Sequence, residues 1–404
     1  MKKTLFIVIC VAVVGAGLSA QELKWSGYFN TGIGAVFSNV EDADPYLTAF
    51  GVDSGQFGYR FRLNGAYTNG DADAGVRFRI QSQAVSNQVF SLPYVYGWFK
   101  PLDMLTINAG LVDDGTWNTG GVLFNDDVGE GLGVLTKLSL AGLDAGVGMY
   151  LGSTGSGGSN NPLAGLGNNT IELADLKYVF SLGYTMEDVF KITASVRTSS
   201  NTNGGIDVAA TGSNAHNDEA VLGFKLLAVP KLTAVLEVKA DHLYKFSDIG
   251  TVFVYEALAY DLGALDLGLN AGQYLNQADQ TGGSSSDFGL MVSPWVSYTI
   301  NKLVPRLDAL YFMAGKPAYV ASAAGGAGSS SGKYNFLNWE AYAPTWNSDY
   351  SVIAVRPSVK FNFDSNIAVE LGDIVNFEKG PDGAYNGESS RLTNIFYADF
   401  VWKF

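Results

Sequence analysis

Four arginines recur at two-residue spacing in two neighbouring stretches of the chain. Arg60 and Arg62 lie in "GYRFRLNGAY", and Arg77 and Arg79 lie in "AGVRFRIQSQ". Residues two apart point to the same face of a β-strand, and the intervening "TNGDAD" has the composition of a tight turn. We therefore expect the four guanidinium groups to share one face of a hairpin. Like charges this close need water or carboxylates to balance them, so the group is either a functional basic wall or a set of locally paired and solvated side chains.

Acids suited to balance these arginines are concentrated in residues 111–131, "LVDDGTWNTGGVLFNDDVGEG". The stretch has no basic residue, and its acids are Asp113, Asp114, Asp126, Asp127 and Glu130. It also holds Trp117 and the apolar residues 122–124, which an exposed loop would not favour. It fits a loop that folds inward and directs its acids at the arginines, or an acidic loop that stays in solvent.

Residues for covalent or metal chemistry are scarce. The two histidines, His216 and His242, have no nucleophile or base at a suggestive spacing, and the single cysteine, Cys10, lies in the N-terminal segment. "DADAG" at 71–75 resembles part of a calcium loop but lacks the later glutamate ligand. We therefore expect no enzyme, no metal and no cofactor. The formal charge of −14 also argues against nucleic-acid binding.

The elements that would position the arginines alternate with a period of two, as β-strands do. In "FKITASVRTS" and "AVRPSVKFNF", for example, Ile192 and Val196 oppose Lys191 and Arg197, and Val355 and Phe361 oppose Arg356 and Lys360. The apolar face of each such stretch carries no charge. Charged residues make up 16% of the chain, against about a quarter in soluble domains, and aromatics make up 13%. This pattern predicts an antiparallel β-barrel that meets lipid outside and water inside.

The connectors alternate between short turns and long loops along the chain. Short ones include residues 69–71, 141–144 and 363–366, and long ones are rich in Gly, Ser and Asn. Outer-membrane barrels have short periplasmic turns and long outer loops in this order. We predict a single barrel domain over residues 21–404 with about 18 strands, or alternatively 16 because Pro294, Pro305 and Pro357 fall inside predicted strands.

Residues 1–20 have the pattern of a secretory signal peptide, with two lysines, an apolar run and small residues near Ala20. Removing Lys2 and Lys3 with it changes the charge from −14 to −16. This segment and the barrel pattern predict a location in the bacterial outer membrane. From the net acidity we expect a mild preference for cations.

The chain ends in "LTNIFYADFVWKF", in which Phe396, Phe400, Trp402 and Phe404 share one face. We expect this strand to face lipid and to close the barrel against "LKWSGYFNTGIGAVF" near the N-terminus. It resembles the C-terminal motif that the assembly machinery reads in bacterial outer-membrane barrels. The resemblance implies that the machinery is a partner of this chain and that these four residues are its signal.

In pattern, the mature chain resembles the general bacterial outer-membrane porins. In that family the third outer loop folds inward and narrows a water-filled channel. The resemblance implies passive diffusion of small hydrophilic solutes or ions, and a constriction with Arg60, Arg62, Arg77 and Arg79 on one wall and the acids of 113–130 on the other. It also implies a homotrimer surrounded by outer-membrane lipid. The family's Pro-Glu-Phe-Gly-Gly loop motif is absent, which leaves the path of the loop open.

Two other functions remain open. A sugar-type selective channel would need aromatics along the lumen; Tyr94, Tyr96 and Trp98 share a face, but we expect that face to meet lipid near the membrane interface. A surface adhesin built on a barrel would use a long outer loop, and residues 321–333 lie in the largest one.

Overall fold

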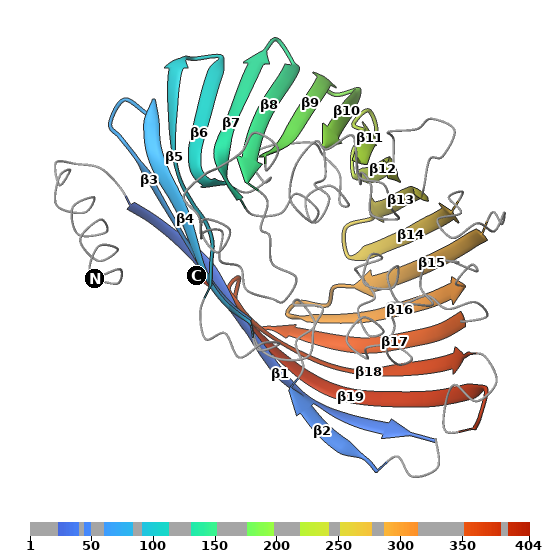
Figure 1. The fold of residues 1–404 in the computed structure, drawn as a ribbon. Coiled ribbons are helices and arrows are strands. Elements are labelled where there is room, and N and C mark those ends of the chain that lie inside the picture. Colours follow the sequence, from blue (N-terminus) through green and yellow to red (C-terminus); the bar gives the residue numbers. More distant parts are fainter. Residues whose placement is uncertain are drawn as a thin grey trace.

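The computed structural model describes residues 23–39, 44–49, 60–83, 91–112, 131–151, 176–197, 219–241, 251–276, 287–313, 351–380 and 387–404. The predicted signal segment, 1–20, lies outside these ranges. Every regular element in them is a β-strand, and all pairings are antiparallel (Figure 1). Within the described ranges, no helix has the length and apolar character needed to cross a membrane.

The strands follow one another around a single closed sheet. The first ten are β1 Leu23–Ser38, β2 Tyr46–Ala49, β3 Arg60–Thr68, β4 Ala74–Gln83, β5 Ser91–Leu102, β6 Leu105–Val112, β7 Gly131–Leu140, β8 Leu143–Leu151, β9 Leu176–Met186 and β10 Phe190–Arg197. The others are β11 Glu219–Leu226, β12 Leu232–Asp241, β13 Thr251–Asp261, β14 Leu265–Asn276, β15 Asp287–Tyr298, β16 Leu303–Met313, β17 Ser351–Asn362, β18 Ile367–Lys379 and β19 Ser390–Lys403.

The 19 segments occupy 18 positions around the barrel, because β2 and β3 share one. Both pair with the same edge of β1: β3 with Leu23 to Asn30 and β2 with Ile33 to Val36. Figure 1 shows β2 beside one end of β1 and β3 beside the other. The prediction of about 18 strands is therefore confirmed, and at this number the interior is wide enough for an aqueous channel.

The barrel closes between the first and last strands, as predicted. β1 pairs with β19 from Tyr28 opposite Lys403 to Ser38 opposite Thr393. At the end of this seam, Gly27 N–H donates to Phe404 O at 2.8 Å, and Phe404 N–H donates to Gly27 O at 3.0 Å. No sheet edge is left between these strands, which is what a sheet in hydrocarbon requires.

The predicted short turns are also present, and β1 begins and β19 ends on the same side of the barrel as these turns. A two-residue turn joins β7 to β8 through Ala141 and Gly142, whose φ angles are 48° and 83°. Two positive φ angles in succession match a type I′ hairpin turn, which follows the twist of the paired strands. A Cβ at Gly142 would lie 2.5 Å from Thr185 O, so this turn also needs a residue without a side chain.

Strand alternation separates an apolar outer face from a polar inner one. In β17, Ile353 and Val355 are 53% and 38% exposed, whereas Ala354 and Arg356 are 1% and 4% exposed. The exposed residues are the apolar ones because this face meets lipid, so accessibility is inverted relative to a soluble protein. Pro357 remains within β17 and pairs with β16, while the ladder to β18 is interrupted beside it. The proline therefore does not remove a strand.

Candidate functional site: the inner wall of the barrel

The arginines predicted as a basic wall lie on the inner faces of β3 and β4. In the register of this hairpin, Arg62 faces Gln81 and Arg79 faces Asn64. The guanidinium groups therefore form a diagonal row and do not oppose one another directly. Arg62 Nε donates to Gln81 Oε1 at 2.9 Å, and Arg79 Nε donates to Asn64 Oδ1 at 2.8 Å. Neutral acceptors hold the two groups in place and leave their charge uncompensated by these bonds.

Aromatic rings on the adjoining strands flank this row. The Arg62 guanidinium lies 5.4 Å from the ring centroid of Tyr28 on β1, and that of Arg79 lies 4.7 Å from the centroid of Tyr94 on β5. Arg60 Nη1 donates to the Tyr28 hydroxyl at 3.3 Å. Arg77 lies two residues along β4, opposite Ala66 and Tyr96, and its side chain is exposed. The structure thus places all four predicted arginines on one inner surface.

The expectation that Tyr94, Tyr96 and Trp98 face lipid is wrong. Tyr94 pairs directly with Arg79 across the β4–β5 ladder, and cross-strand partners share a face. Tyr96 is 4% exposed and packs with Tyr94, with ring centroids 5.7 Å apart. The outward residue of this part of β5 is Phe99, which is 46% exposed. The three aromatics therefore line the interior beside the arginines.

The predicted acidic wall falls on residues 113–130, which lie outside the described part of the chain. The structure therefore does not place Asp113, Asp114, Asp126, Asp127 or Glu130. His216 and His242 also lie outside the described ranges. Among the residues that are described, no group of three His, Cys, Asp or Glu side chains is arranged as metal ligands would be.

The sequence patterns did not identify the acids of the barrel wall itself. Asp308 on β16 is 1% exposed and lies between two arginines. Arg356 Nη2 donates to its Oδ2 at 2.9 Å, and Arg306 Nη2 donates to its Oδ1 at 2.7 Å. The guanidinium of Arg306 also lies 4.4 Å from the ring centroid of Trp295. The two-residue spacing of Arg306 and Asp308 indicated in the sequence that they could pair, because residues two apart on a strand share a face.

Further inward acids follow on β18 and β19. The Tyr397 hydroxyl donates to Glu370 Oε1 at 2.7 Å, and Arg391 Nη2 lies 2.7 Å from Glu378 Oε2. The Oδ1 and Oδ2 atoms of Asp399 accept hydrogen bonds from Asn30 Nδ2 of β1, at 2.8 and 2.9 Å.

Asn30 links the charged residues of β19 to the arginine row. It is fully buried, bonds to Asp399 on one side and pairs with Arg60 on the other. The inner surface from β16 to β4 therefore carries ion-paired and hydrogen-bonded side chains, with buried apolar residues such as Ile374 and Ile395 between them.

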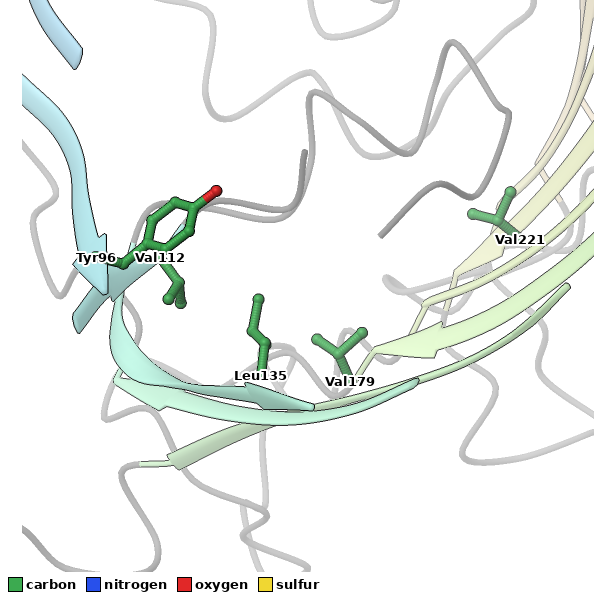
Figure 2. Close-up of a cluster of buried hydrophobic side chains, with 5 residues drawn as sticks. All are labelled: Tyr96, Val112, Leu135, Val179 and Val221. Atoms are coloured by element: carbon green, nitrogen blue, oxygen red, sulfur yellow. The ribbon is translucent and has the colours of Figure 1, made fainter. Parts of the chain in front are cut away.

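Apolar side chains also cluster on the inner wall, on strands from β5 to β11. Tyr96, Val112, Leu135, Val179 and Val221 form a buried cluster, and Figure 2 shows them on the concave side of the sheet. Val179 is fully buried, and Leu135 is 2% exposed. The arginine wall, in contrast, is only partly buried, so solvent reaches it more freely.

Comparisons with known proteins support the architecture. Acinetobacter baumannii OccAB4 matches with a TM-score of 0.53 and 10% identity over 95% of this chain and 98% of that one. Pseudomonas aeruginosa OccK11 (OpdR) matches with a TM-score of 0.51 and 10% identity over 95% and 96%. Both are outer-membrane porins. This chain has the fold of a bacterial outer-membrane porin.

At 10% identity, these matches establish the porin fold and do not assign a solute. A mutant of the Rh. blastica porin also aligns over 95% of this chain, with 12% identity and a TM-score of 0.42. No protein-family model matches the sequence, and no curated protein matches it. The porin barrel and its outward apolar surface place the chain in the bacterial outer membrane.

Proposed function

We propose that the chain forms a water-filled channel for passive diffusion of small hydrophilic solutes or ions across the outer membrane. The observation that carries this proposal is the closed barrel of 18 positions with charged and hydrogen-bonding side chains inside and apolar side chains outside. A packed core would not favour Arg60, Arg62 and Arg79 on its inner surface, because removing a charged side chain from water is costly. A lumen that holds water accommodates them.

We place the narrow part of this channel beside the arginine row. Arg62 lies six residues from the last residue of β3, which is about 15 Å above the short turns for a strand tilted by about 40°. That is near the middle of the membrane. An inward third loop bearing the acids of 113–130 would complete the constriction, as the resemblance to general porins implies.

The test is to replace all four arginines by glutamine and to record currents from the refolded chain in planar bilayers. We expect single-channel conductance to change and the reversal potential in a salt gradient to shift toward cations. Replacing the turn residues Lys231 and Lys302, which lie outside the lumen, is the control for lost positive charge. Unchanged conductance and selectivity would remove the arginines from the constriction.

A sugar-type channel is the second candidate, because Tyr94, Tyr96, Trp98 and Tyr28 supply aromatic faces along one part of the lumen. Aromatic rings of this kind stack against the apolar faces of sugars. This function predicts that a neutral sugar blocks the ionic current at a concentration that rises when Tyr94 and Tyr96 become alanine. A current that no sugar affects would leave general diffusion as the function.

We also propose that Phe396, Phe400, Trp402 and Phe404 are the assembly signal. They lie on the outward face of the closing strand, and Trp402 and Phe404 contact each other with ring centroids 5.4 Å apart. Removing Phe404 should reduce insertion in cells more than refolding into pure lipid vesicles, and equal loss in both would refute a signal. A homotrimer is a further proposal from the resemblance, which the mass of the detergent-extracted complex tests.

A further inference from the structure

Three lysines gather on the inner wall near the short turns. Lys137 on β7, Lys191 on β10 and Lys225 on β11 alternate with outward residues such as Leu138, Ile192 and Phe224, so all three face the lumen. Lys191 and Lys225 are direct partners across the β10–β11 ladder.

The carboxylate of Asp144 is close to this lysine cluster. Asp144 Oδ1 on β8 lies 3.4 Å from Lys137 Nζ, and both side chains are partly exposed, at 30% and 26%. Asp144 also accepts a hydrogen bond from the Ser139 hydroxyl. Together, Asp144 and the three lysines carry a net charge of two positive units.

Placing two lysines directly opposite each other has a structural cost. Like charges at such cross-strand positions are destabilising, and a neutral partner would remove the repulsion. The Lys191–Lys225 pair therefore does not stabilise the β10–β11 ladder. Mobile anions in a water-filled lumen would balance the charge of the two lysines. The pair then has a role in attracting anions that pass through the channel.

The surrounding mouth has the same sign. Among the described strand residues within four positions of a short turn, six further basic residues face the lumen by alternation: Lys24, Arg77, Lys100, Arg306, Lys360 and Lys403. Under the same criterion there are four acids, Asp144, Asp261, Asp266 and Glu370. Nine basic residues less four acids leave five positive charges; because Arg306 is paired with Asp308 just beyond this limit, four of them remain at this end of the lumen.

The short turns beyond the strands also carry acids, but some of these carboxylates form hydrogen bonds that stabilise the turns. Asp364 Oδ1 accepts the N–H groups of Asn366 and Ile367 at 2.7 and 2.8 Å. Asp73 is hydrogen-bonded to Asn69 in the β3–β4 turn. These groups lie in bulk solvent, where salt screens them over about 10 Å, whereas the lysines lie on the path of a solute.

We infer that the short-turn mouth is an anion-selective section of the channel, with Lys137, Lys191 and Lys225 at its centre. Small anions then permeate in preference to small cations, although the chain as a whole is acidic. This inference rests on the proposed channel function and reverses the cation preference expected from net charge. What decides selectivity is the charge on the lumen wall, and most of the acidic excess lies elsewhere.

The experiment uses residues 21–404 refolded and inserted in planar bilayers under a KCl gradient, with chloride and potassium as the probes. For the wild-type chain we expect a reversal potential whose sign indicates that chloride permeates more readily than potassium. A unit charge about 8 Å from a permeating ion in screened water changes the anion-to-cation ratio about two-fold. The triple change Lys137→Gln, Lys191→Gln and Lys225→Gln should therefore lower the ratio about eight-fold.

Two matched variants control this result. The triple Lys→Arg variant keeps the charge and should keep the wild-type selectivity. The triple Lys231→Gln, Lys302→Gln and Lys379→Gln removes the same charge from two turns and from the outward face of β18, and it should leave selectivity unchanged.

The possible outcomes distinguish a failure of the anion selectivity from a failure of the channel function. A conducting wild-type chain that prefers potassium, or a lumen triple variant that behaves like the outer triple variant, overturns the inference and leaves the channel function standing. A refolded chain that conducts no ions refutes the proposed function and this inference with it. Since residues 21–404 contain no cysteine, Lys225→Cys adds a second readout. A negatively charged thiol reagent should reduce chloride selectivity, and a positively charged one should restore it.

Discussion

Adjacent residues on one strand offer a direct test of how the barrel sorts side chains between lipid and water. Leu182 on β9 is 54% exposed on the outer face, between Ala145 and Ala194 of the neighbouring strands. It lies four residues from Met186, where β9 ends, so it is about 10 Å above the strand end and near the bilayer midplane. We predict that Leu182→Arg destabilises the folded barrel by about 2–4 kcal/mol.

Its neighbour provides the control. Ser181 faces the lumen between Gly146 and Ser195, two small residues that leave room for a longer side chain. Ser181→Arg introduces the same charge one residue away and should change stability by about 0.5 kcal/mol or less. The difference between the variants corresponds to a folding equilibrium that differs by about 10- to 300-fold, since 1.4 kcal/mol is a factor of ten.

The measurement is equilibrium folding into lipid vesicles across a urea series, with the folded fraction read from the shift in gel mobility between unheated and heated samples. Leu182→Arg should unfold at a clearly lower urea concentration than Ser181→Arg. If both variants lose the same stability, or Ser181→Arg loses more, the assignment of the two faces to lipid and water is wrong.

Two further perturbations probe the inner wall and the closing seam. Asp308→Ala leaves Arg356 buried without its carboxylate and should cost about 3–5 kcal/mol in the same urea assay; adding Arg356→Met should recover part of the loss, and no recovery would contradict the pairing. Val36 faces Ile395 across the β1–β19 seam, so the double variant Val36→Cys and Ile395→Cys should form a disulfide under mild oxidation. The offset pair of Val36→Cys with Tyr397→Cys should cross-link far more slowly, and equal rates would refute the register.

The barrel was predictable because its local signals agree with the global fold. Period-two alternation identified the outward face of Val355 and Phe361, and the polar, Gly-containing connectors identified the short turns. Pro357 weakened the strand count in the sequence, but its ring interrupts only one of two ladders. The closing strand was also predictable, since its last residues need a partner that only the first strand supplies.

The faces of β5 show where alternation fails. The inner face carries Tyr94, Tyr96 and Trp98 and is therefore more apolar than the outer face, which includes Gly97. Hydrophobicity alone therefore predicts, incorrectly, that the three aromatic residues face lipid. Lys100 lies on the same face as Trp98, 5.8 Å from its ring centroid, and its charge was the signal for a lumenal position.

Long-range pairs on the wall were beyond the sequence for a different reason. Asp308 and Arg356 are 48 residues apart and meet only through the β16–β17 register. Alternation places each on the inner face but does not fix how the two strands slide relative to each other. The direct opposition of Lys191 and Lys225 has the same origin, because a connector of more than twenty residues separates their strands.

The paired backbone bonds between Gly27 and Phe404 have a consequence for the order of the chain. Where the first and last strands meet, the ladder continues as it does between any two neighbours, so the folded ring has no intrinsic starting point. A gene that linked residue 404 to residue 23 and opened the chain within one of the long loops would encode the same circle of pairings. Such a circular permutant would differ from the natural protein in the sequence of events during synthesis and insertion, and in the strand that arrives last.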